Sequence, residues 1–373
     1  MKIRSVIIAL SLGLYFFITP STTHAAAASP ALLKAMKDAE TKGYIFETSH
    51  DEIVAKAKKE GKLRVVSTLE PAVIKAMKDG FRKKYPFVTE LRVDEIGSID
   101  ENQRLLLEVK AGAAKGWDVN RLFTDIYDEY LPYQKKFDIL GMAQQKVLNI
   151  PPALVDPRTR NIVITSTNVN IIAYNKTLIS ADKVPGTWED FLKPEFKGKK
   201  FIMDVRPLPL AILVPAWGLE KTLDYARKLA AQDPIWGRGH SRIIASVVTG
   251  EYPLFLGTNL GAVKRAQEKD RTGTLGSKII EPVPIRLHEG YGILNTADYP
   301  YIGLLWLEFH ASPEGQRIMD AHWPLGASVF SAGSAQEGLT RGKKLSVIDW
   351  SNHGRVDDDM KKLVEALGFP KAK

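Results

Sequence analysis

The chain has 373 residues, a formal net charge of +9 and no cysteine. The missing thiols exclude a disulfide scaffold and a lipid-modified cysteine. The contents of 45% hydrophobic and 25% charged residues are ordinary for a globular protein. No run of Lys and Arg is interleaved with aromatic residues, so we expect no nucleic-acid partner. The length favours two domains.

Residues 1–25 have the pattern of a signal peptide. Lys2 and Arg4 precede an apolar run over 6–18, and Thr23, His24 and Ala25 form a small-residue cleavage site. The apolar run is too short to span a bilayer. An uncleaved anchor is the alternative, which the helix-breaking Pro20 disfavours. We therefore expect export to a periplasm.

The amino-terminal half alternates predicted strands with predicted helices. Apolar residues recur at helical spacing after Pro71, and again around Leu105, Leu106 and Val109. This alternation indicates a mainly parallel sheet with helices on both faces. The predicted strands cover 63–66, 88–96 and 118–123, a turn and cap cover 97–100, and the predicted helices cover 71–85 and 125–137.

The second half begins with a long β-rich stretch over 161–174 that could cross from one lobe to another. After it, strands and helices alternate again, which indicates a second α/β lobe. The predicted elements there are strands over 201–204, 253–257 and 290–294, and helices over 219–231, 241–249, 260–268, 299–320 and 357–369.

The sequence resembles the extracellular solute-binding proteins of ABC importers, in particular the type II periplasmic group that binds ferric iron, thiamine, polyamines or phosphonates. Four segments carry this resemblance: AKKEGKLRVVST (57–68), TWEDFLKPEFKGK (187–199), GEYPLFLGTNLGAVKRAQEK (250–269) and YPYIGLLWLEFHASPEGQRIM (299–319). Each segment alone is weak, but their order and spacing together are specific for the superfamily.

The resemblance implies an α/β fold of two lobes, each a mainly parallel sheet flanked by helices, joined by crossing hinge strands. The lobes would close over one small molecule, and the closed complex would dock on a membrane permease. We expect a monomer with a signal peptide at 1–25, lobe 1 at 26–165 plus 293–325, and lobe 2 at 166–292 plus 326–373.

Polar loops between strands and helices are the candidate binding residues. In open parallel sheets, ligands bind beyond the carboxyl ends of the strands, near helix N-termini. We therefore expect Ser67, Thr68 and Glu70 to line the cleft, together with Ser98 in the next turn. The alternative is an ordinary capped turn, because Ser and Thr are also good N-caps.

Direct iron binding is an alternative function that the sequence disfavours. Ferric-binding members of the group hold the metal through two adjacent tyrosines, and those positions fall here at Leu260 and Gly261. Neither residue can ligate iron. The first-loop histidine of that group falls near Glu70, which could coordinate a metal.

The positions that hold a helper anion in ferric binders fall near Arg206, His240, Ser241 and Asn259. A guanidinium offers two parallel charge-assisted hydrogen bonds to a carboxylate or phosphate. Our main hypothesis from the sequence is therefore a small anionic solute, either an organic carboxylate or a phosphorus-containing compound. For Arg238 and Arg242, a binding role and a solvated surface remain equally open.

Two further sites complete the candidate set. Thr258, next to Asn259, repeats the strand-to-helix geometry of the first loop from the opposite lobe. Tyr291, between two glycines, could stack on a ligand or could only fill the hinge.

An exported hydrolase is the remaining alternative. GRGHSR, at 237–242, is neither a G-x-S-x-G nucleophile elbow nor a complete G-x-G-x-x-G loop. The histidines show no metal-ligand spacing. We therefore expect no enzyme activity, no cofactor and no bound metal.

Overall fold

The computed structural model describes residues 29–96, 99–122, 126–323 and 325–368. The predicted signal peptide and Ser98 lie outside the described residues. The elements of the first half are α1 (Pro30–Thr41), α2 (His50–Glu60), β1 (Lys62–Ser67), α3 (Pro71–Lys84), β2 (Glu90–Glu95), α4 (Ile99–Lys110), β3 (Val119–Leu122), α5 (Tyr127–Tyr130), η2 (Leu131–Tyr133), α6 (Ile139–Gln144), η3 (Pro152–Leu154) and β4 (Val163–Asn175).

The second half continues the alternation. Its elements are η4 (Glu189–Leu192), η5 (Pro194–Phe196), β5 (Ile202–Asp204), α7 (Leu208–Ala211), α8 (Val214–Trp217), α9 (Leu219–Ala230), β6 (Ile235–Gly237), α10 (His240–Val248), β7 (Leu254–Asn259), α11 (Leu260–Lys269), β8 (Leu275–Lys278), β9 (Val283–Ile293), α12 (Pro300–Ala311), α13 (Pro313–His322), α14 (Ala335–Thr340), β10 (Leu345–Ile348), η6 (His353–Arg355) and α15 (Val356–Ala366).

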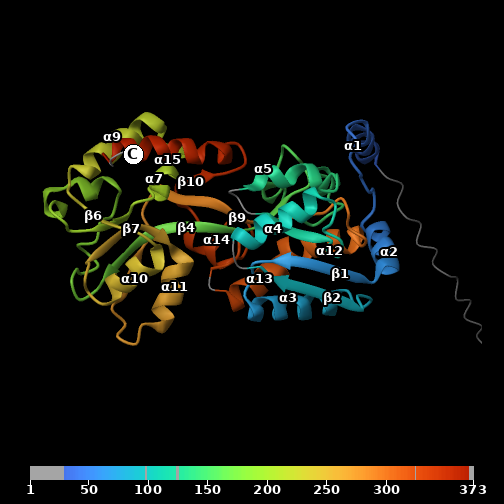
Figure 1. Ribbon diagram of the computed structural model, residues 1–373, viewed down its shortest axis with the longest axis horizontal. Helices are drawn as coiled ribbons and strands as arrows, with labels where there is room; N and C mark the ends of the chain where they lie inside the picture. Colours follow the sequence, from blue (N-terminus) through green and yellow to red (C-terminus); the bar gives the residue numbers. More distant parts are fainter. Residues whose placement is uncertain (1–28, 97–98, 123–125, 324, 369–373) are drawn as a thin grey trace, which may run out of the picture.

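Two lobes share two long strands, β4 and β9 (Figure 1). Within the described residues the strand order is β2-β1-β3-β9-β4-β7-β5-β6, with β10 beside β9 and β8 beside β4. We call the part around β2, β1 and β3 lobe 1, and the part around β7, β5 and β6 lobe 2. Strands inside each lobe pair in parallel, whereas β4 and β9 pair antiparallel with each other. The predicted fold class is confirmed; the chain boundaries of the lobes stay a prediction.

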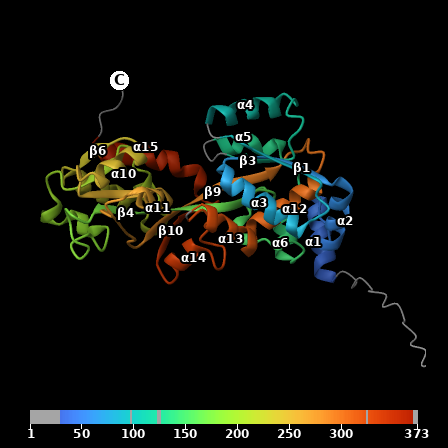
Figure 2. The same ribbon diagram turned by 90° about the horizontal axis from the view of Figure 1, so that it is seen from below.

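The helices cover both faces of the lobes, as the sequence indicated (Figure 2). In α3 the residues that recur at helical spacing, Val73, Ile74, Met77 and Phe81, are buried. They join one apolar cluster with residues of α2 and α12. Each fully buried aliphatic or aromatic side chain contributes roughly 1.5–3 kcal/mol relative to exposure. None of the helices described reaches the combination of length and apolarity that a bilayer crossing requires.

The helix predicted over 125–137 is wrong in extent. Helical structure there is limited to α5 and the short η2, which contains Pro132. Proline cannot donate a backbone N–H to a continuing helix. The chain leaves this segment in extended conformation, and Gln134 bridges antiparallel to Leu294.

A buried aspartate holds the start of α12 against β1. The Asp118 carboxylate is 0% exposed. It accepts hydrogen bonds from the Arg64 guanidinium at 3.1 and 3.0 Å and from the backbone N–H groups of Asp298 and Tyr299 at 3.0 and 3.1 Å. Arg64 also pairs with the exposed Asp298 at 2.8 Å. The hydrogen bond between Asp118 and the Asp298 N–H ties segments 180 residues apart in the chain.

We predict that Asp118→Asn lowers the free energy of unfolding by about 3–5 kcal/mol, since it breaks a buried charge pair and leaves donors unpaired. Urea denaturation followed by circular dichroism measures the change. Asp298→Asn is the matched control on the same arginine, and it should cost about 1 kcal/mol or less because that carboxylate is exposed. Equal effects of the two substitutions would contradict this account.

Candidate functional site

Most of the candidate residues lie at or just beyond the carboxyl ends of strands, in one group in each lobe. Ser67 ends β1, Asp204 ends β5 and Asn259 ends β7. In α/β sheets, this carboxyl end is where helix N-termini and strand-end loops meet a ligand. The residues form two polar networks, one in each lobe, and both include or adjoin residues of β9.

The network of lobe 1 is centred on Glu289, whose carboxylate is 3% exposed. One oxygen, Oε1, lies 3.3 Å from Arg121 Nη2 and 3.1 Å from His288 Nε2. The other, Oε2, accepts hydrogen bonds from Thr68 Oγ1 at 2.7 Å and from the Tyr291 hydroxyl at 3.3 Å. Both carboxylate oxygens therefore have two partners each, as a buried charge requires.

The electrostatics of this network favour an ionised carboxylate. Burial acts to raise the pKa of Glu289, but the charges of Arg121 and His288 and the hydrogen bonds from His288 and Thr68 outweigh burial. They hold its pKa well below the usual range. Burial, together with the nearby Glu289 charge, raises the pKa of Tyr291, so Tyr291 stays a neutral hydroxyl.

The polar loop after β1 is attached to this network. Ser67 Oγ lies 2.8 Å from the Tyr291 hydroxyl and accepts a hydrogen bond from the Leu69 N–H at 3.2 Å. Ser67 is 1% exposed, whereas Glu70 is exposed and occupies the N-cap position of α3 without a side-chain capping bond. Ser67 and Thr68 thus fix the loop, and Glu70 is its outward-facing polar group.

The network of lobe 2 is centred on Asp204. Its Oδ1 accepts a hydrogen bond from the Arg206 N–H at 2.8 Å, and its Oδ2 accepts one from the Gly239 N–H at 3.0 Å. One carboxylate therefore holds two loops together, the loop that carries Arg206 and the loop that leads into α10. Two of the positions predicted from the sequence, Arg206 and His240, thus lie on or next to loops that the same carboxylate holds.

His240 is half-buried at the start of α10, and its Nδ1 lies 3.1 Å from Thr258 Oγ1. Burial lowers its pKa from the ordinary value of 6.5; Asp204 acts to raise it, and the positive charges of Arg206 and Arg286 lower it further. The free imidazole is therefore neutral near pH 7. The same charges create a positive potential that would attract an anion.

A β-bulge at Gly257 directs Thr258 toward His240. The register of β7 on β4 shifts there, because Ile171 pairs with Thr258 and Ile172 with Leu256. Gly257 has a φ of +80°, and a Cβ on it would lie 2.5 Å from Pro209 Cβ. Only glycine permits this close approach of β7 to the segment that follows Arg206.

The remaining candidate residues differ in their exposure and in their contacts. Asn259 accepts a hydrogen bond from the Ala262 N–H as the N-cap of α11, and donates to Asn168 on β4 at 2.9 Å. Arg206 and Ser241 are exposed at the edge of the lobe 2 network, as are Arg238 and Arg242. Tyr291 is 0% exposed and its ring lies 5.2 Å from that of His310. These contacts favour the hinge-filling role for Tyr291.

The sequence did not single out Arg121, His288, Asp204 or Arg286. Their signal was position: Arg121 lies within the strand predicted over 118–123, Asp204 ends the strand predicted over 201–204, and His288 and Glu289 precede the glycine-flanked Tyr291. Within the described residues, no cluster of three or more His, Asp and Glu side chains is arranged to hold a metal ion.

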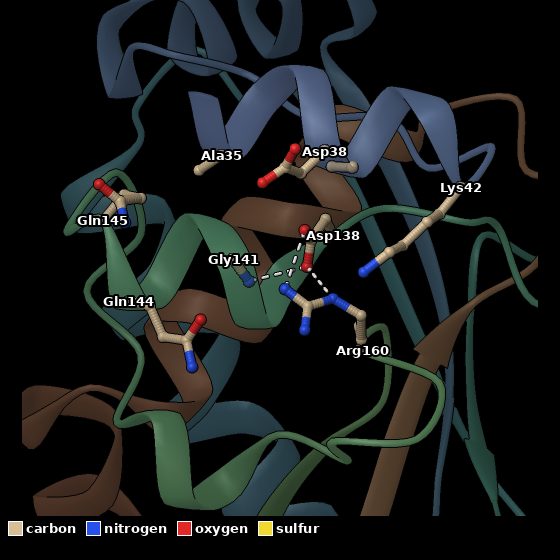
Figure 3. Close-up of a pocket in the computed structure, with 9 residues that line it drawn as sticks. Ala35, Asp38, Lys42, Asp138, Gly141, Gln144, Gln145 and Arg160 are labelled. Carbon is tan, nitrogen blue, oxygen red and sulfur yellow. Dashed lines mark hydrogen bonds and ion pairs between the residues drawn. The ribbon is translucent and has the colours of Figure 1, made fainter. Parts of the chain in front are cut away.

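A separate cavity lies between α1 and α6, away from β9. Figure 3 shows its lining residues, among them Asp38, Lys42, Asp138 and Arg160. Its volume is about 210 Å³. Arg160 donates to both oxygens of Asp138 at 2.8 and 3.0 Å, and Asp138 caps the Gly141 N–H. This pair is satisfied within the protein, and we assign no ligand to the cavity.

The chain is similar to solved structures of iron-binding proteins. Ferric iron-binding protein A of Mannheimia haemolytica, in an open conformation, has a TM-score of 0.64 and 17% identity over 83% of this chain and 99% of that chain. Trichodesmium IdiA (FutA), in complex with iron and citrate ligands, has a TM-score of 0.61 and 19% identity over 83% and 100%. At these identities the similarity establishes the fold.

A third similar structure, the ferric binding protein from Campylobacter jejuni, has a TM-score of 0.60 and 18% identity over 83% of this chain and 100% of that chain. No curated protein matches the sequence. The family model of bacterial extracellular solute-binding proteins matches residues 128–352, which is more than half of the chain. The resemblance carried by the four segments is thereby confirmed, and the chain belongs to the bacterial extracellular solute-binding protein family.

Proposed function

We propose that the chain is the exported receptor of an ABC importer and that it binds ferric iron together with a small carboxylate anion between its lobes. It hands this complex to the permease without chemical change. The observation that carries the proposal is that the Asp204 carboxylate holds together the loop of Arg206 and the loop that leads to His240 at the start of α10. The positive charges of Arg206 and Arg286, both of which act on His240, disfavour a bare cation and favour an anion or an anionic metal complex.

The similar solved structures favour iron over a free organic anion. They are described as iron-binding proteins, and one is described with iron and citrate. This supports the ferric alternative better than our main hypothesis from the sequence. However, Leu260 and Gly261 offer no phenolate oxygen, so a bound anion would have to supply part of the oxygen ligands of iron. Glu70, exposed on lobe 1, is the carboxylate that could add one more.

A free organic carboxylate or phosphonate remains the second candidate. The cationic side chains of lobe 2 support it directly, because a guanidinium and an imidazole can bind either anion without a metal. The two candidates differ in one measurable respect. A ferric–carboxylate receptor needs iron for tight binding, whereas a receptor for the free anion does not.

Delivery by lobe closure fits the geometry. A ligand that contacts both lobes stabilises the closed arrangement relative to the open one by the difference in its contact free energies. A permease can then recognise the closed arrangement. We expect no turnover, in keeping with a family of solute-binding proteins.

We predict that ferric citrate raises the melting temperature of the protein and that citrate alone raises it much less. Ligand at a hundred times its dissociation constant adds about 2.7 kcal/mol to the free energy of unfolding.

Arg206→Ala should weaken ferric citrate binding about tenfold to a hundredfold, as expected for the loss of a charge-assisted hydrogen bond. Thermal shift and isothermal titration calorimetry measure both effects.

Arg227→Ala is the matched control, since Arg227 is an exposed arginine on α9. It should leave binding unchanged. Tight binding of citrate or a phosphonate without iron would select the second candidate, and binding of polyamines with no binding of any anion or ferric complex would refute the charge argument.

We further predict that the pKa of His240, measured by NMR titration, lies below 6.5 in the free protein and rises when ferric citrate binds, because the bound negative charge stabilises the imidazolium. Since the complex then takes up a proton, affinity should increase as the pH falls from about 8 to about 6. The increase should disappear in His240→Gln. An unchanged His240 pKa on binding would place the anion elsewhere.

A further inference from the structure

Glu289 occupies the point at which β9 changes lobes. On one side of it, Gly290–Ile293 pair with β3 of lobe 1. On the other side, Val283–Arg286 pair with β10, whose Ser346 donates a hydrogen bond to Ile212 of lobe 2. Leu287 and His288 separate Glu289 from the stretch paired with β10, and Gly290, the first residue paired with β3, follows Glu289 directly. A rotation of one lobe relative to the other must therefore bend β9 at these few residues, and it must bend β4 where that strand passes from β9 to β7.

The backbone at Glu289 departs from regular strand geometry. Its φ is +48°, in the left-handed region that non-glycine residues rarely adopt. In the ladder with β4, Gly290 pairs with Ile164 and His288 pairs with Ser166, but Glu289 has no partner between them. The Glu289 carbonyl instead accepts a hydrogen bond from the Thr165 hydroxyl at 3.2 Å. A strained residue that interrupts a ladder between two lobes marks a candidate pivot.

The side chain of the same residue holds the loop that follows β1. Glu289 Oε2 accepts the hydrogen bond from Thr68 at 2.7 Å, and Tyr291, which bonds to Oε2 at 3.3 Å, lies 2.8 Å from Ser67 Oγ. The Arg121 guanidinium secures the carboxylate from β3. The position of the loop at 67–70 therefore depends on the side chain of Glu289, and the backbone of Glu289 lies where β9 passes between the lobes.

We propose that Glu289 is the pivot of lobe closure and a positioning residue of the binding site, because its carboxylate ties the loop at 67–70 to the point about which the lobes rotate. The assignment rests on the proposed function for the identity of the ligand, but not for the motion. Closure would carry the loop, and Glu70 with it, toward lobe 2 as one unit with Glu289. The loss of the carboxylate would uncouple the loop from the lobe rotation.

Distances between spin labels on the two lobes test this proposal. The chain has no cysteine, so Lys83→Cys on α3 and Lys269→Cys on α11 supply the only thiols for labelling. Both lysines are exposed. Pulsed electron paramagnetic resonance of the full chain, with and without ferric citrate, gives the distribution of distances between the lobes. We expect a narrow distribution in the labelled parent protein.

In Glu289→Gln we expect a broader distribution and an affinity for ferric citrate about tenfold weaker. Glu308→Gln is the matched control, because Glu308 is also a buried glutamate, 3% exposed, and pairs with His50 at 2.8 Å on the far side of lobe 1. It should lower the melting temperature without broadening the distribution. Equal broadening in both variants would overturn the proposal, since it would then reflect general destabilisation.

Thr68→Val provides a second variant that retains the ion pair of Glu289 with Arg121 and removes only the bond to the loop. We expect its label distances to match the parent and its affinity for ferric citrate to fall. If Glu289→Gln folds and keeps the distance distribution and the affinity of the parent, the positioning role is refuted. If Glu289→Gln does not fold, a parent-like affinity in Thr68→Val refutes it. If the parent does not bind ferric citrate but Glu289→Gln still broadens the distances, the proposed ligand is wrong and the pivot stands.

Discussion

The antiparallel pairing of β4 with β9 is the constraint on which the rest of the structure depends. Each strand contributes residues to both lobes, so the lobes share backbone hydrogen bonds instead of only a side-chain interface. Strands are stiff along their length and twist and bend most easily where the ladder is interrupted. In the proposed pivot, the two lobes stay in contact while the stretch of β9 around Glu289 changes its dihedral angles.

Several carboxylates of this fold are buried, so their hydrogen-bond partners must come from the protein instead of from water. A buried carboxylate must be matched by donors, and Glu289 is matched by four and Asp118 by five. In lobe 2, the Asp204 carboxylate accepts hydrogen bonds from two backbone N–H groups. In each case, one carboxylate fixes loops that come from distant parts of the chain.

The fold by itself carries little information about the ligand, since one architecture serves unrelated solutes. The residues of the strand-end loops determine which ligand can bind. Lobe 2 presents His240 with Arg206 and Arg286, whereas Leu260 and Gly261 provide no oxygen donors at the start of α11. The similar solved structures are described as iron-binding proteins, and the loops of this chain carry positive charge. The ferric–carboxylate ligand proposed above is chosen to agree with both.

The sequence by itself determined the local structure, because periodic apolar residues and strand-end polar residues act over a few positions. It predicted α3, α10, α11 and the long strand β4, and it named Arg206, His240 and Thr258 among the candidate binding residues; of these, the structure brings His240 and Thr258 into contact. It missed the early end of the helix at Pro132. Only the tertiary structure decided that Glu289 joins Thr68 and Arg121, which lie 221 and 168 residues away in the chain. Such contacts depend on how the lobes pack, and no local spacing encodes them.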